Sequence, residues 1–192
     1  MVRKREPSLK LSNCDRIDFI EAITDDKADR FAKTFVSKAD ITSGAWCNCI
    51  GAYNDDGELM AAIITTISKR APHVANLQLL HTFAKHRGKG AAKILCEESL
   101  KRVKSKGAQY FRVSSEPDAV GFYTKIGFKF WGKQKSGCQL SIFRIDGDTY
   151  AEGDYDYTDQ LINNAIHKKG KGGCVEIFDL ATNQKPLDLE GF

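Results

Sequence analysis

The chain has 192 residues, of which 42% are hydrophobic, and this is enough for one compact domain with a full core. The formal charge of +4 is small and comes largely from a Lys-rich stretch over residues 85–106, so charge alone is weak evidence for an acidic partner. No apolar run approaches the roughly 20 residues that span a bilayer, and the basic start lacks a signal-peptide core. We therefore expect a cytoplasmic protein without membrane spans.

In chain order, residues 16–23 alternate apolar and polar side chains, which predicts a strand. Apolar residues then recur at helical spacing over residues 28–36 and predict a helix. The runs 46–54 and 58–68 flank an Asn-Asp-Asp-Gly turn and predict an antiparallel hairpin. A further strand is expected over residues 74–83.

The clearest helix signal covers residues 91–106, and Gly107 is expected to end this helix. Its apolar side is predicted to hold Ile94, Leu95, Leu100 and Val103. The elements expected next are a strand over 110–114, a short helix over 119–125, and a pair of strands over 128–132 and 138–145.

After residue 145 the composition changes. Residues 146–159 are rich in Asp, Gly and Tyr and predict a loop, and residues 157–168 are compatible with a helix. A Lys- and Gly-rich connector leads to a strand over 174–180, which is free to extend the sheet, to cross to a second subunit of a homodimer, or to cover a cleft. The expected division is a basic segment over 1–15, a catalytic domain over 16–145 and a C-terminal extension over 146–192.

The six cysteines include no C-x-x-C pair and have no His at ligand spacing, so we expect no metal site. Free thiols are the simplest interpretation in a reducing cytosol. Cys47 and Cys49 would point to the same face of a strand, where a thiol pair is conceivable, although small buried strand residues are the simpler interpretation.

The motif Arg87-Gly88-Lys89-Gly90-Ala91-Ala92 lies between the predicted strand 74–83 and the predicted helix 91–106. A helix N-terminus carries partial positive charge, and glycines allow a diphosphate to approach the backbone, so the motif predicts an anion site. Lys85 adds positive charge beside it. The order of residues fits neither a P-loop nor a G-x-G-x-x-G turn, and an exposed helix start without a ligand is the simpler alternative.

Together with a second segment, Ala119-Val120-Gly121-Phe122-Tyr123-Thr124-Lys125-Ile126-Gly127-Phe128, this turn resembles the two signature motifs of the GNAT superfamily. The resemblance covers about residues 16–145 and implies an α/β fold, with a mixed, mostly antiparallel central sheet flanked by helices. It also implies acetyl-CoA or another acyl-CoA as cosubstrate, with its pyrophosphate on the backbone amides of the turn. Glu116 and Pro117 stand where the family often has Asn, which departs from the pattern.

For catalysis, the resemblance places Tyr123 near the thioester sulfur, also as a cofactor-binding residue. A tyrosine with a free pKa of about 10 is protonated at pH 7 and can act as the general acid. His81 is the best candidate for the general base, with His73 and Glu116 as alternatives, and Gln78 is suited to ordering a water. A structural histidine is the simpler interpretation of His81. A backbone N–H near Thr82 or Phe83 is expected to polarise the carbonyl.

The sequence does not name the acceptor amine. The Asp- and Tyr-rich residues 148–159 are suited to a cationic amine. The rival interpretation uses the basic clusters 3–5, 133–135 and 168–171 for a nucleic acid and is not favoured. Tyr123 with residues 127–132 also distantly resembles a segment of Mom-type phage DNA-modification proteins, which share the GNAT fold. A third interpretation is a non-catalytic CoA-binding interaction domain.

Overall fold

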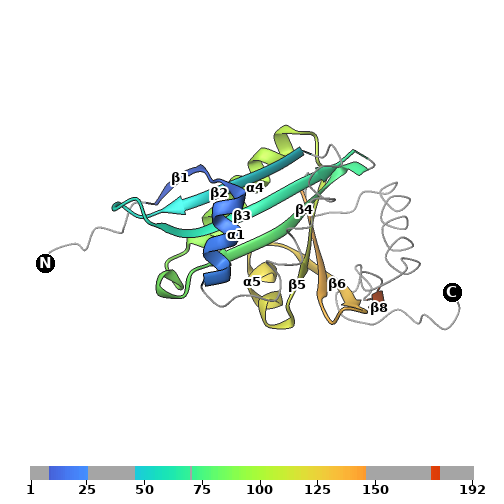
Figure 1. Ribbon diagram of the computed structural model, residues 1–192. Helices are drawn as coiled ribbons and strands as arrows, with labels where there is room; N and C mark the ends of the chain where they lie inside the picture. Colours follow the sequence, from blue (N-terminus) through green and yellow to red (C-terminus); the bar gives the residue numbers. More distant parts are fainter. Residues whose placement is uncertain (1–8, 26–45, 70, 146–173, 178–192) are drawn as a thin grey trace, which may run out of the picture. The chain divides into compact units, whose positions relative to one another are not determined.

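The computed structural model describes residues 9–25, 46–69, 71–145 and 174–177 (Figure 1). The chain divides into two compact units, Met1–Ala108 and Gln109–Phe192. None of the helices in the described ranges is long and apolar enough to cross a membrane. The helices predicted over residues 28–36 and 157–168 and the loop predicted over 146–159 lie outside these ranges.

The first unit contains an antiparallel sheet. Strands β2 (Trp46–Tyr53) and β3 (Leu59–Ser68) form the predicted hairpin, and β4 (Ala71–Thr82) pairs with β3. A short strand that the sequence did not indicate, β1 (Lys10–Asn13), pairs with the outer side of β2. The strand order in this unit is therefore β1-β2-β3-β4.

The strand predicted over residues 16–23 was wrong, because this segment forms helix α1 (Arg16–Asp25). The Asp15 side chain caps the helix, and its Oδ1 atom accepts the backbone N–H groups of Ile17 at 2.8 Å and Asp18 at 3.1 Å. These contacts satisfy two of the amides that a helix start leaves unpaired. The local cap thus favours a helix where the alternation of side chains suggested a strand.

The buried face of α1 follows the helical period. Phe19, Ile20 and Ile23 are buried, whereas Ile17, which a strand would have put on the same face as Phe19, is 60% exposed. The three buried residues pack on one face of the sheet, and Figure 1 shows α1 lying across these strands. The sheet residues that complete this cluster are Cys49, Ala62 and Ile64.

The helix predicted over residues 91–106 is confirmed as α4 (Ala91–Ser105), which packs mainly on β3. Its buried face differs in part from the predicted one. Leu95 and Val103 are buried as expected, but Ile94 and Leu100 are only partly buried. The rest of the buried face consists of small residues, which a search for large apolar side chains does not detect: Ala91, Cys96 and Ser99.

The second unit also contains antiparallel strands, in the order β5-β7-β6-β8. Its predicted strands and its predicted short helix are confirmed. Its elements are β5 (Tyr110–Ser115), the 3-10 helix η2 (Pro117–Ala119), α5 (Val120–Lys125), β6 (Lys129–Gln134), β7 (Gln139–Arg144) and β8 (Cys174–Ile177).

Strand β8 extends the sheet within the chain, which is one of the alternatives left open for the strand predicted over 174–180. It pairs antiparallel with β6 of the same chain, with Glu176 opposite Lys133. The C-terminal region therefore returns to the sheet edge formed by β6, and residues 178–180 lie outside the described ranges.

Aromatic rings fill the core around α5. The Phe128 ring lies 5.7 Å from Phe111, 5.4 Å from Tyr123 and 5.6 Å from Phe143, measured between ring centroids. Phe111 and Phe128 are almost completely buried. This packing fixes the position of α5 on the strands and, with it, the position of Tyr123.

Candidate functional site

The turn that precedes α4 depends on two glycines. Gly88 has a φ angle of 76° and Gly90 a φ angle of 79°, both in the left-handed region that other residues rarely adopt. A Cβ atom at either position would have no heavy atom within 4 Å. Backbone conformation, and not crowding, therefore requires glycine here, and the space beside the backbone is open.

Gly90 is the N-cap of α4, and no side chain caps this end of the helix. The first turn of α4 also contains no acidic residue. The helix dipole is thus not neutralised by the protein at this end, as an anion site requires. This uncapped helix start supports the prediction of a diphosphate on the backbone from Arg87 to Ala92.

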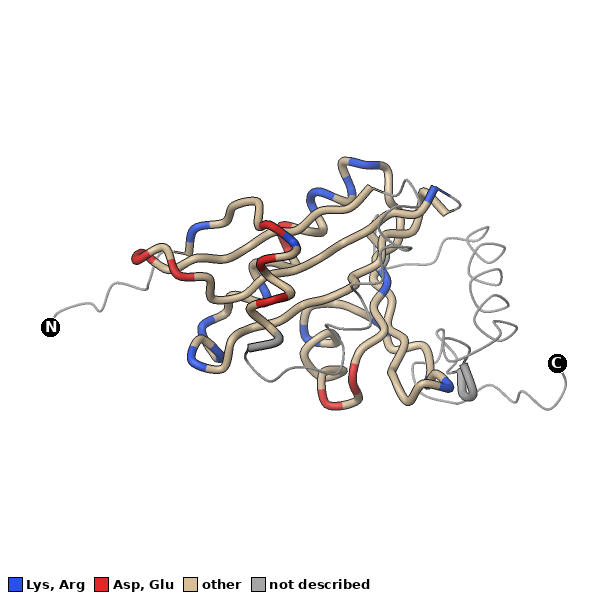
Figure 2. Tube along the Cα trace, in the orientation of Figure 1, with Lys and Arg blue, Asp and Glu red and all other residues tan. Residues whose placement is uncertain are grey.

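Positive side chains surround this turn, and Figure 2 shows Lys and Arg gathered on the loop between β4 and α4. Arg87 and Lys89 are exposed, and the Arg87 Nε atom donates a hydrogen bond of 3.3 Å to the Thr82 carbonyl oxygen at the end of β4. Lys85 forms an ion pair with Glu58. Two of the three predicted cations, Arg87 and Lys89, are therefore not paired with an acidic side chain among the described contacts.

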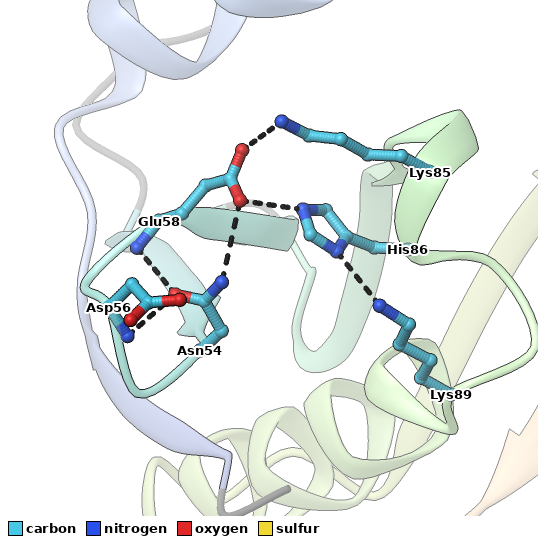
Figure 3. A network of polar contacts seen from close by, with 6 residues as sticks. All are labelled: Asn54, Asp56, Glu58, Lys85, His86 and Lys89. Atoms are coloured by element: carbon cyan, nitrogen blue, oxygen red, sulfur yellow. Dashed lines mark hydrogen bonds and ion pairs between the residues drawn. The ribbon is translucent and has the colours of Figure 1, made fainter.

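A polar network connects this loop to the β2–β3 turn (Figure 3). The Asn54 Oδ1 atom accepts the backbone N–H groups of Asp56 at 3.1 Å and Glu58 at 2.8 Å, which holds the turn in shape. The Glu58 carboxylate then reaches Lys85. The hydrogen bond from Lys85 is the main cause that lowers the pKa of Glu58. The contact between Glu58 and Lys85 therefore weakens at acidic pH, as Glu58 becomes protonated.

His86, in the 3-10 helix η1 (Ala84–His86), lies at the centre of the network and is only 5% exposed. Its Nδ1 atom is 3.4 Å from the Lys89 Nζ atom, and its Nε2 atom is 3.3 Å from Glu58 Oε2 without the alignment of a hydrogen bond. Because an ammonium group only donates, this contact to Lys89 requires Nδ1 to accept and places the ring proton on Nε2. His86 thereby links Glu58 to a cation of the turn.

Sequence reasoning missed both Glu58 and His86. His86 stands between Lys85 and Arg87 and reads as part of a solvated basic stretch, while Glu58 lies in a hairpin turn far away in the chain. The one signal that was present is a histidine inside a run of lysine and arginine.

Hydrogen bonding at the end of β4 distinguishes the two backbone N–H groups, of Thr82 and Phe83, that were predicted to polarise the carbonyl. The Phe83 N–H donates to the Met60 carbonyl oxygen at 3.1 Å and continues the pairing with β3. It is therefore not available for the predicted contact with a substrate carbonyl. Neighbouring N–H groups of a strand point to opposite edges, so the N–H of Thr82 points away from β3.

His81 lies one residue earlier on β4, opposite Ala62 on β3. It is partly buried, and its ring packs edge-on against Phe83 with 5.0 Å between the ring centroids. Since Ala62 belongs to the cluster under α1, His81 lies on the α1 face of the sheet.

Gln78 is the extra residue of a bulge in β4, because Ile64 pairs with Leu79 and Thr65 pairs with Leu77. Its Nε2 atom donates a hydrogen bond of 2.8 Å to Thr66 Oγ1. The side-chain amide nitrogen of Gln78 is thus hydrogen-bonded to a residue of the neighbouring strand β3. His73, the other candidate on β4, is partly buried near the start of the strand.

Tyr123 belongs to the second unit, on α5, and is 6% exposed. Its ring packs edge-on against Phe128, and its carbonyl oxygen accepts the N–H groups of Ile126 at 3.2 Å and Phe128 at 3.0 Å, which close the helix. Tyr123 is therefore held in a fixed orientation. Glu116 is exposed at the start of η2.

Two of the three basic clusters considered for a nucleic acid, residues 3–5 and 168–171, lie outside the described ranges. In the third, Lys133 and Lys135 are exposed and Gln134 is buried. Across the residues that the structure describes, no three His, Cys, Asp or Glu side chains are grouped as a metal site would need.

Residues 19–143 match the family described as acetyltransferase (GNAT) domain. The chain belongs to the acetyltransferase (GNAT) family. Membership of the GNAT family makes an acyl-CoA, usually acetyl-CoA, the cosubstrate. No curated protein matches the chain significantly in sequence.

Solved GNAT structures share the fold. A GNAT-family acetyltransferase from Staphylococcus aureus Mu50 has a TM-score of 0.57 at 14% identity, over 72% of this chain and 100% of the other. The PaiA N-acetyltransferase of Thermoplasma acidophilum, in complex with coenzyme A, has a TM-score of 0.55 at 18% identity, over 71% and 99% of the two chains. YhbS of Escherichia coli, in complex with CoA, has a TM-score of 0.55 at 14% identity, over 76% and 86%. The predicted α/β class, with a mostly antiparallel sheet flanked by helices, is confirmed.

Proposed function

We propose that this GNAT protein transfers an acetyl or other acyl group from acyl-CoA to a primary amine of a small molecule or a protein. The observation that carries the proposal is the turn before α4, where Gly88 and Gly90 adopt left-handed conformations at an uncapped helix start. Such a turn presents backbone N–H groups to an anion. Family membership makes the pyrophosphate of CoA the anion to expect.

The chain's contribution to cosubstrate binding is positive charge and backbone amides. Arg87 and Lys89 are exposed beside the turn, and cations in this position form charge-assisted hydrogen bonds with phosphate oxygens. Lys89 is also in contact with the buried His86. This contact links the exposed ammonium group of Lys89 to a buried side chain.

For the chemical step we assign polarisation of the thioester carbonyl to the backbone N–H of Thr82. In this family the cosubstrate supplies the activated thioester. A backbone donor in a strand is fixed before the reaction, so it stabilises the charge that develops on the carbonyl oxygen without reorganisation. The Phe83 N–H, by contrast, is engaged by Met60.

Two side chains are assigned to proton transfer. Tyr123 donates its hydroxyl proton to the thiolate as the carbon–sulfur bond breaks, and its fixed ring supports this role. His81 accepts the proton that the amine releases when its nitrogen attacks the carbonyl carbon, because a neutral imidazole has a ring nitrogen that accepts a proton.

The nature of the acceptor is the least constrained part of the proposal. The acidic and tyrosine-rich residues 148–159 favour a cationic amine by charge. These residues lie outside the described ranges, so their composition alone supports this assignment.

The test combines binding with turnover. Acetyl-CoA is expected to raise Tm of the full chain, and free CoA is expected to appear when an amine acceptor is supplied. Tyr123→Phe is expected to lower turnover by about 100-fold or more, because it removes the proton donor, while the rise in Tm with acetyl-CoA remains.

Tyr110→Phe is the matched control, because Tyr110 is also a buried tyrosine of the second unit and is not assigned to the reaction. It should retain turnover. An equal loss of binding and turnover in Tyr123→Phe would make Tyr123 a structural residue. Absence of any rise in Tm with acetyl-CoA would overturn the cosubstrate assignment.

A further inference from the structure

Three cysteines gather where the β1–α1 link meets β2. Cys14 and Cys47 are partly buried and pack against the core cluster that contains Cys49. All three are free thiols. The proposed acyl transfer uses none of them, so the cluster requires an explanation of its own.

The sheet register sets Cys14 directly opposite Cys49. Lys10 pairs with Tyr53 and Asn13 with Ile50, so the next pair in the same register is Cys14 with Cys49. The Cys14 N–H donates a hydrogen bond of 3.1 Å to the Cys49 carbonyl oxygen, which confirms that pairing continues by one residue. Side chains opposite each other in an antiparallel pair point to the same face and are in contact.

This placement is compatible with a disulfide. The Cα atoms of a hydrogen-bonded antiparallel pair are about 5.5 Å apart, inside the range of about 4.4–6.8 Å that disulfides span. Cys47 and Cys49 are neighbours on one face of β2, where a separation of two residues is about 6.6 Å, at the limit of this range. The cross-strand pair is therefore favoured over the pair within β2.

The two thiols differ in access. Cys49 is buried, whereas Cys14 is partly exposed at the end of β1. A reagent in solvent thus meets Cys14 first. Cys49 is suited to the second step, in which a thiol attacks a mixed disulfide on its neighbour.

Neighbouring groups shift the pKa values of Cys14 and Cys49 in opposite directions. Hydrogen bonds from Cys49 and, to a smaller extent, from Tyr53 lower the pKa of Cys14 to about 7, against the effect of burial and of the nearby carboxylates of Asp15 and Asp18. Sharing that proton raises the pKa of Cys49. On the same face, the Arg16 guanidinium lies 3.8 Å from the Cys47 sulfur and adds positive charge. These surroundings favour one thiolate in the cluster at neutral pH.

We infer that Cys14 and Cys49 are a modification site that forms a reversible intramolecular disulfide with low-molecular-weight disulfides such as oxidised glutathione. The Cys14 thiolate attacks one sulfur of the reagent, forms a mixed disulfide and releases one thiolate. Cys49 then loses its proton to that thiolate and attacks the Cys14 sulfur, which displaces the second thiolate. The reagent is reduced by two electrons, and the two cysteines are oxidised.

The product joins the start of α1 to β2 and closes a covalent loop over residues 14–49. This loop contains α1 and the connection from α1 to β2. A reducing thiol reverses the reaction, because each exchange step is itself reversible.

The experiment treats the reduced full chain with oxidised glutathione, blocks remaining thiols with N-ethylmaleimide in acid, and maps unreduced peptides by mass spectrometry. The expected result is a linked pair of peptides that contain Cys14 and Cys49 and lack two hydrogen atoms. Cys96 should be recovered in its blocked form, since it is buried in α4 and burial raises its pKa to about 12. Dithiothreitol should abolish the link.

Variants separate the two steps. Cys49→Ser is expected to stop at the mixed disulfide between Cys14 and glutathione, and Cys14→Ser is expected to form neither species. Cys138→Ser is the matched control, because Cys138 is also partly buried but belongs to the second unit, and it should still form the link.

Recovery of both Cys14 and Cys49 as blocked thiols in the wild-type chain would overturn the inference, as would a link from Cys14 to Cys47 instead. The wild-type map decides the question even if a variant does not fold. It also does not depend on acyl-CoA binding, so the proposed acyltransferase activity can fail without affecting this result.

Discussion

At the scale of single residues, Cys14 offers a direct test of the thiol environment. Its pKa is lowered to about 7 mainly by the hydrogen bond from Cys49. The thiolate is the reactive form, so alkylation by iodoacetamide should rise with pH through a midpoint near pH 7 and level off at higher pH. The measurement is the rate of modification of the Cys14 peptide across a pH series.

Cys49→Ala is the informative variant for this prediction, because it removes the donor and keeps a small apolar side chain. The midpoint for Cys14 should then move up toward the ordinary cysteine value of about 8.5. An unchanged midpoint would show that the hydrogen bond from Cys49 is not the cause. A rate that did not depend on pH between 5 and 9 would contradict the lowered pKa itself.

His86 shows at the same scale how a residue gains a role through burial. A histidine between two basic residues of the sequence suggests solvent exposure, yet the ring is 5% exposed and lies between Glu58 and Lys89. The reason lies in the hairpin turn, where Asn54 fixes the backbone from which Glu58 extends. No local pattern around His86 carries this information.

At the scale of elements, the start of α4 can be tested with two glycines that differ in one property. Gly90 and Gly121 are both exposed, and a Cβ atom at either would have no heavy atom within 4 Å. Gly90 has a φ angle of 79°, whereas Gly121 lies inside α5 without a positive φ. Gly90→Ala should therefore lower the free energy of unfolding by about 1–2 kcal/mol, and Gly121→Ala should raise it by about 0.5–1 kcal/mol.

Urea unfolding of the two variants and of the wild-type chain measures both effects. Gly90→Ala should also weaken acetyl-CoA binding, because the substitution alters the turn proposed to hold the pyrophosphate, and Gly121→Ala provides the comparison. Equal changes in stability for both variants would contradict the conformational requirement at Gly90. Unchanged binding in a destabilised Gly90→Ala chain would separate the turn from the cosubstrate.

The elements with strong local signals were predictable from the sequence. The hairpin of β2 and β3 has a turn sequence between two apolar runs, and α4 has a helical period that ends at a glycine. The prediction failed over residues 16–23, where the alternation of apolar residues also fits a helical face and the Asp15 cap decides between the two. Strand β1 is four residues long and mostly exposed, so it leaves no apolar pattern.

The candidate site was predictable to the extent that it is local. The turn from Arg87 to Ala92 and the segment around Tyr123 are continuous motifs, and both were found in the sequence. The use of the Phe83 N–H by Met60 depends on the pairing of β4 with β3. Such pairing becomes visible only when two distant segments are placed together.

At the scale of the whole molecule, composition and strand pairing divide the C-terminal region differently. The change in composition after residue 145 indicated an extension separate from the catalytic domain. The structure brings β8 of that region back to β6, at the end of the strand order β5-β7-β6-β8. Part of the extension thus belongs to the sheet of the second unit.

Deletion of residues 146–192 is expected to lower Tm and to promote association at high protein concentration, because β6 keeps β7 but loses β8 and exposes unpaired N–H and C=O groups at that edge. For a chain of this length, Tm should fall by about 2–4 °C for each kcal/mol lost. Thermal unfolding and light scattering measure the two effects. The matched control is a shorter deletion of residues 178–192, which keeps β8 and should leave both properties close to those of the full chain. If the two deletions behave alike, β8 does not stabilise the edge of β6.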